Sequence, residues 1–80
     1  MGGVTDGIVN LDINDFEPGR YTLDVYNSLL QNVYHDNLNI VADGLIEVNL
    51  SKVQNGFYVL ELKDSKNIYT ISKKLIIQKR

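Results

Sequence analysis

The sequence predicts a small, single-domain, all-β protein, built as an antiparallel sandwich of six or seven short strands. Three observations support this fold class. Apolar residues recur at every second position through most of the chain, the spacing that puts alternate side chains on one face of a strand. Turn-forming residues interrupt the alternation at intervals of about 8 to 12 residues. No segment carries an apolar stripe of useful length at helical spacing.

Length and composition limit the possibilities further. A chain of 80 residues makes one domain, and a domain this small buries only about 60% of the surface that its unfolded chain exposes. Apolar residues make up 44% of the chain, which excludes the composition of a disordered protein. There is no cysteine, so a disulfide framework and a thiolate metal site are excluded. No run approaches the roughly 18 to 20 apolar residues of a membrane-spanning helix, and the first residues are not expected to act as an amino-terminal export signal, because they lack a basic segment followed by an apolar run.

The first two strands are expected on either side of a turn at residues 16–19. Residues 9–13 (VNLDI) and residues 21–25 (YTLDV) each alternate apolar and polar side chains. Between them, Pro18 presets the backbone angle of a turn and Gly19 tolerates positive φ. We therefore expect a tight antiparallel connection here.

The middle of the chain predicts one weak strand and one clear strand. Residues 33–38 are more polar and are expected to form an edge strand. Ala42-Asp43-Gly44 supplies the next turn, and residues 46–50 (IEVNL) resume the alternation.

Two further strands complete the prediction. Asn55-Gly56 favours left-handed backbone conformations and precedes a strand at residues 56–62, whose Tyr58 should face the core. Residues 64–67 predict a polar hairpin connection into a long last strand, residues 68–78. Strand number and turn spacing favour an immunoglobulin-like arrangement of the sandwich.

Charge is distributed unevenly along the chain. Residues 1–62 contain nine acidic and two basic side chains, whereas residues 63–80 contain six basic and one acidic side chain. The basic end either attracts an acidic partner or forms a solvated surface that offsets the rest of the fold. The sequence leaves both interpretations open.

No residue pattern predicts catalysis, a cofactor or a strong metal site. His35 is the only histidine and lies beside Asp36, which a strand would point to the opposite face, so we expect a surface histidine. Residues 12–15 (DIND) lack the ligand series of an EF-hand and predict at most weak calcium binding. The serines lie in no nucleophile-elbow context. Because only Tyr69 of the five tyrosines lies in the basic stretch, nucleic-acid binding is not expected either.

Several short motifs, taken in order, resemble a known family. They are Thr5-Asp6-Gly7 before the strand at residues 8–13, Gly19-Arg20-Tyr21 in residues 19–27, Gln31-Asn32-Val33, Leu50-Ser51, Gly56-Phe57-Tyr58, and the lysine-bounded residues 73–79 (KKLIIQK). Together they resemble the type A carboxy-terminal sorting domains of proteins exported by the type IX secretion system of Bacteroidetes. The resemblance covers nearly the whole chain.

The chain departs from the family pattern at two places. Val4 stands where the opening element has its last proline, and Leu30 replaces the usual glycine before Gln31. The first departure concerns the amino-terminal boundary, where Met1-Gly2-Gly3 is expected to be an added start and the chain a piece of a longer protein. The second concerns a turn.

The resemblance implies a function without catalysis. Such a domain follows a larger cargo protein, reaches the periplasm with it, and is recognised by the outer-membrane type IX translocon through its terminal strands. A surface sortase commonly removes the domain, and the cargo ends on the cell surface or in the medium. The alternative is an immunoglobulin-like accessory or carbohydrate-binding module of a cell-surface enzyme.

Five residues are the candidate recognition residues under this interpretation. Gly56 and Tyr58 would be structural parts of the signal, and Lys73, Lys74 and Lys79 its contact charges. The opposing interpretation makes Gly56 a strand-start glycine, Tyr58 a core residue, and the lysines solubilising charges that prevent edge-to-edge aggregation.

Overall fold

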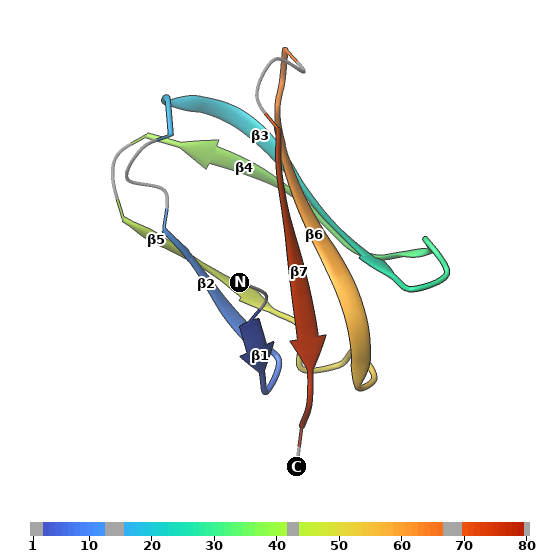
Figure 1. Cartoon of the computed structure of the whole chain (residues 1–80). Coiled ribbons are helices and arrows are strands. Elements are labelled where there is room, and N and C mark those ends of the chain that lie inside the picture. The colour runs from blue at the N-terminus through green and yellow to red at the C-terminus, as the bar shows by residue number, and fades with distance from the viewer. Residues whose placement is uncertain (1–2, 13–15, 42–43, 67–69, 80) are drawn as a thin grey trace.

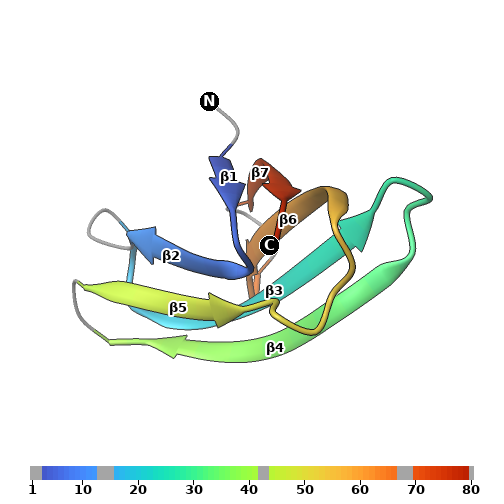
Figure 2. The ribbon, with the colours of Figure 1, turned by 90° about the horizontal axis from the view of Figure 1, so that it is seen from below.

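The computed structural model describes residues 3–12, 16–41, 44–66 and 70–79, and these residues form two β-sheets (Figures 1 and 2). The strands are β1 (Gly3–Thr5), β2 (Ile8–Asp12), β3 (Gly19–Asn27), β4 (Asn32–Ile40), β5 (Leu45–Asn49), β6 (Gly56–Asp64) and β7 (Thr70–Ile77). One sheet has the order β1-β7-β6-β3-β4, and the other pairs β2 with β5. Within these ranges no helix is long and apolar enough to cross a membrane. The predicted small all-β sandwich is confirmed.

The strand order is that of an immunoglobulin-like sandwich. The run β7-β6-β3-β4 corresponds to the G-F-C-C′ order of the larger immunoglobulin sheet, and β2 with β5 corresponds to strands B and E. The first strand adds a feature that the alternation did not predict. β1 pairs with β7 in parallel, from Gly3 opposite Leu75 to Thr5 opposite Ile77, whereas the other strand pairs are antiparallel.

The tight connection expected between the first two strands is wrong. β2 pairs with β5, where Val9 lies opposite Val48, and β3 pairs with β4 and β6. Period-two alternation requires only that one face of a strand be buried, and the face of β2 is buried against the other sheet. The chain thus changes sheets in this segment, of which residues 13–15 lie outside the described residues.

The other predicted strands agree with the structure. Among the described residues β4 pairs only with β3, as an edge strand does. β5 covers the clear strand of residues 46–50 except for Leu50, which is buried just beyond it. β6 and β7 form the predicted antiparallel pair. Residues 42–43 of the predicted turn, Asn67 of the predicted hairpin connection and residues 68–69 of the predicted last strand lie outside the described residues. Gly56 has a positive φ of 158°, a backbone conformation that residues with a side chain rarely adopt, whereas Asn55 is not among the described residues with positive φ.

The core lies between the inner face of the five-stranded sheet and the β2-β5 pair. Alternate residues of β3, β6 and β7 supply most of it, because each of these strands turns every second side chain inward. The buried members are Val9, Tyr21, Leu23, Val25, Ile40, Val48, Leu50, Tyr58, Leu60, Leu62, Leu75 and Ile77. Tyr58 is therefore a core residue, as predicted.

The turn between β3 and β4 places Leu30 in a left-handed conformation. Its φ is 64°, and its amide donates to the carbonyl of Asn27 at 2.9 Å. The Asn27 side chain closes the turn by accepting from the amides of Leu29 and Gln31. A left-handed residue other than glycine, asparagine or aspartate is strained, which is a physical reason for glycine at this position.

Leu30→Gly is expected to stabilise the domain by about 0.5–1 kcal/mol. The substitution removes about 1–2 kcal/mol of strain caused by the left-handed backbone. Glycine has a larger backbone entropy in the unfolded chain, and this offsets part of the gain. Because the Leu30 side chain is 79% exposed, no packing is lost. Urea unfolding followed by circular dichroism measures the change, with Leu29→Gly as the matched exposed control, which should destabilise. Equal or opposite shifts for the two variants would contradict the expectation.

Candidate recognition surface

Tyr58 closes the corner by which the chain enters β6. Its ring is buried, and its hydroxyl donates to the carbonyl of Gln54 at 2.6 Å. A tyrosine near the start of strand F that bonds a carbonyl a few residues upstream is the tyrosine corner of immunoglobulin-like sandwiches. Gly56 begins the strand, and its positive φ would strain a residue with a side chain, although a Cβ placed there would make only an ordinary 3.6 Å contact with the Tyr58 ring. Both predicted residues lie in one local structure.

The same local structure occurs at the start of β3. The Tyr21 hydroxyl donates to the carbonyl of Glu17 at 2.8 Å, and Gly19 stands two residues before Tyr21, as Gly56 does before Tyr58. The nine residues of β3 and the nine of β6 show the same sequence of buried and exposed positions. Because the two strands are antiparallel, the two corners lie at opposite ends of the sheet. The sequence contains Gly-x-Tyr twice, but we did not predict from it that the two copies form the same local structure.

Lys73 and Lys74 are the displayed charges of β7. Lys74 lies opposite Val59 on the outer face of the five-stranded sheet. Lys73 is on the same face of β7 as the buried Leu75, but it lies at an open margin of the sandwich. There it lines a hollow of 280 Å³ together with Leu11 and Phe16. Both side chains are exposed, and neither has an ion-pair or hydrogen-bond partner within the described part of the chain. They are available to a partner.

Lys79 is held within the fold. Its ammonium group donates to the carbonyls of Ser51, at 2.8 Å, and Val53. Its backbone amide donates to the Asn55 side-chain oxygen at 2.9 Å, and its carbonyl accepts from the Asn55 side-chain amide at 3.3 Å. We call this set of contacts the Lys79 clasp. It fastens the end of the chain to the loop between β5 and β6, the loop that also supplies the acceptor of Tyr58.

The free edge of β7 is only partly covered. β1 pairs with β7 from Leu75 to Ile77, and the amide of Gln78 continues the contact by donating to the Thr5 carbonyl at 2.8 Å. Residues 70–74 have β6 on one side and, among the described residues, no strand on the other. This stretch, which includes Lys73 and Lys74, is called the open half-edge below. It carries main-chain groups that a further strand could pair with.

Four other ionisable side chains on the outer face form two pairs. His35 Nδ1 and Asp24 Oδ1 lie 2.6 Å apart, and His35 is exposed on the edge strand, as predicted. Lys63 lies 3.0 Å from Glu61, whose hydrogen bond and negative charge raise the pKa of the Lys63 ammonium group. No group of three histidine, cysteine or acidic side chains in the described ranges is arranged to hold a metal ion. Of the residues 12–15 considered for calcium, only Asp12 is described.

Comparison with known proteins places the chain in a family. A family model described as a secretion system C-terminal sorting domain matches residues 5–78, from the end of β1 to the residue after β7. No curated protein and no solved structure matches the chain significantly. The family match includes both tyrosine corners and the two displayed lysines. The chain belongs to the family of type IX secretion C-terminal sorting domains.

Proposed function

We propose that this domain directs an upstream cargo protein through the type IX outer-membrane translocon and has no catalytic activity of its own. The observation that carries the proposal is the family match over residues 5–78. A sorting domain acts in export across the outer membrane, so the cargo reaches the cell surface or the medium. The outer-membrane translocon is the first partner, and a surface sortase is the second. No cofactor takes part.

The open half-edge is our candidate for the contact with the translocon. A partner strand placed beside residues 70–74 would pair with main-chain groups, which supply affinity without requiring a particular sequence. Lys73 and Lys74 point to opposite faces of β7 and would meet acidic side chains on either face of the added strand. Gly56 and Tyr58 contribute by shaping the start of β6, against which β7 is paired.

From the sequence we expected Lys79 to be a contact charge, but in this proposal its role is structural. Because its ammonium group already has two carbonyl acceptors, it supplies order to the terminal segment and not a contact charge. The alternative function, an accessory or carbohydrate-binding module, has no observation in its favour among the described residues.

A reporter experiment tests the proposal. Residues 4–80 are fused behind a periplasm-targeted reporter in a Bacteroidetes host with an intact type IX system, and the reporter is measured in the periplasm, on the surface and in the medium. We expect release with the whole domain and periplasmic retention when residues 73–80 are deleted. Release that persists after this deletion contradicts the proposal.

Charge reversal separates recognition from folding. The double variant Lys73→Glu/Lys74→Glu should keep its melting temperature and lose export, because both side chains are exposed and unpaired in the described structure. Lys52→Glu/Lys66→Glu is the matched control, since these two exposed lysines lie outside β7. Equal export by the two double variants would exclude Lys73 and Lys74 as contact charges.

A further inference from the structure

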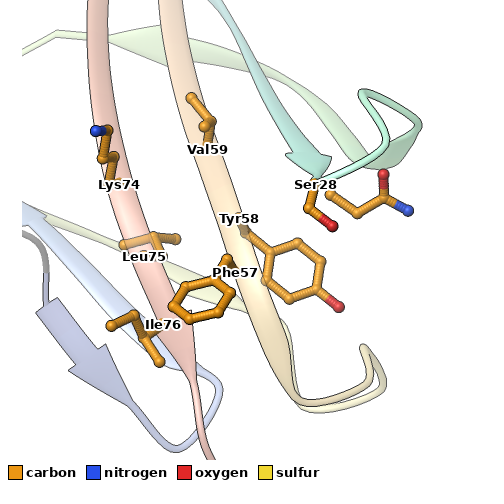
Figure 3. A pocket seen from close by; sticks show the side chains of 8 residues that line it. Ser28, Phe57, Tyr58, Val59, Lys74, Leu75 and Ile76 are labelled. Atoms are coloured by element: carbon orange, nitrogen blue, oxygen red, sulfur yellow. The ribbon is translucent and has the colours of Figure 1, made fainter.

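An apolar groove lies on the outer face of the five-stranded sheet, beside Lys74 (Figure 3). Its volume is 390 Å³, and its walls come from β6, β7 and the end of β3. Phe57 and Val59 stand on β6, Lys74 and Ile76 on β7, and Asn27 and Ser28 close the far side. The pocket is open to solvent, and Figure 3 shows the Phe57 ring standing over the ribbon between Ile76 and Tyr58.

Apolar side chains of three neighbouring strands form a row that extends from the groove. Val4 of β1 lies opposite Ile76 of β7, which lies opposite Phe57 of β6. The Val4 side chain is 64% exposed and the Phe57 side chain 68% exposed. An outer sheet face in contact with water is ordinarily polar, and contiguous exposed apolar side chains on a small protein indicate a binding surface.

Charge limits what the groove can receive. The nearest charged groups along the outer face have partners of their own: Asp24 lies 2.6 Å from His35, and Glu61 lies 3.0 Å from Lys63. Lys74 borders the groove and has no such partner in the described residues. A complementary occupant therefore carries an apolar group for the groove and a negative charge for Lys74. The two groups are about as far apart as neighbouring side chains of a peptide.

We propose that the groove binds an extended segment of the type IX machinery in which an apolar side chain is followed closely by a carboxylate. The apolar side chain lies in the groove against Phe57, Val59 and Ile76, and the carboxylate reaches the Lys74 ammonium group. The groove's volume of 390 Å³ lies near the lower end of the range for ligand pockets, and the side chains of an extended peptide fit within it. This inference rests on the proposed function and adds a side-chain contact to the main-chain pairing at the open half-edge.

Four variants of the reporter fusion test the groove. Phe57→Ser and Lys74→Glu should each reduce export about tenfold or more, the size of effect expected for an anchor residue, with the reporter accumulating in the periplasm. Lys74→Arg should retain export because it keeps the positive charge. Leu45→Ser is the matched control, since Leu45 is 69% exposed on β5, away from the groove, and should export normally. Each purified domain is first shown to keep its thermal transition.

The outcomes separate the two proposals. If the unaltered domain exports the reporter and Phe57→Ser exports equally well, the groove is excluded and the sorting function stands. If the unaltered domain fails to export the reporter, both fail. Sedimentation of the purified domain supplies a second measurement: a dimer that Phe57→Ser dissociates would identify a second copy as the occupant and overturn the inference. A monomer together with export loss in Phe57→Ser supports it.

Discussion

Replacing Tyr58 by alanine is expected to lower the free energy of unfolding by about 3–5 kcal/mol, enough to leave a domain of this size marginally folded. The substitution removes a buried aromatic ring from the inner face of β6 and also the hydroxyl that binds the Gln54 carbonyl. Urea unfolding followed by near- and far-ultraviolet circular dichroism measures the loss. Reporter export at growth temperature should fall with stability.

The conservative variant isolates the hydroxyl. Tyr58→Phe keeps the ring and should cost about 1–2 kcal/mol, because one partly buried hydrogen bond is lost. Tyr21→Phe should cost a similar amount, and the double variant should show additive losses because the two corners lie at opposite ends of the sheet. Tyr26→Phe on the outer face is the control and should change stability little. A Tyr58→Phe variant as stable as the parent would show that the corner hydrogen bond contributes nothing.

The second large effect is expected at Lys79. Lys79→Met keeps most of the side-chain length and removes the donors to the Ser51 and Val53 carbonyls, so we expect a loss of about 1–3 kcal/mol. Hydrogen exchange should locate the change, with the amide of Val53, which donates to Leu50, exchanging faster.

Two controls define what the clasp contributes. Asn55→Ala removes the two side-chain bonds to the Lys79 backbone and should open the same segment while leaving the ammonium contacts possible. Lys74→Met removes an equal charge from the same end of the chain and should leave stability unchanged, because Lys74 is exposed. If Lys74→Met were as destabilising as Lys79→Met, the clasp would not be the cause.

The sequence predicted the parts of the fold that depend on local pattern. Alternation is a property of each strand alone, so residues 21–25, 46–50 and 56–62 were placed correctly, with their apolar faces inward. The polar character of residues 33–38 predicted an edge strand, because an edge strand has less of its surface covered. Tyr58 was assigned to the core for the same reason.

Long-range features could not be predicted in this way. Alternation does not say which sheet buries a strand, so β2 was paired with β3 instead of β5. A three-residue strand such as β1 is too short to show a period. Lys79 has the same chemistry as Lys73 and Lys74, and only the position of the loop after β5 distinguishes it. The groove beside Phe57 depends on a register across three strands, which no single segment encodes.

The parallel pairing of β1 with β7 has a mechanical consequence. The amino end of β1 and the carboxyl end of β7 lie at opposite ends of this pair (Figure 1). A force that draws Gly3 and Ile77 apart therefore pulls along both strands and loads their hydrogen bonds together, in shear, whereas a force across the pair would break them one at a time. The pairing of the short β1 with β7 thus makes the domain resist tension along these strands. The hydrogen bond from the Gln78 amide to the Thr5 carbonyl lies at one end of the pair.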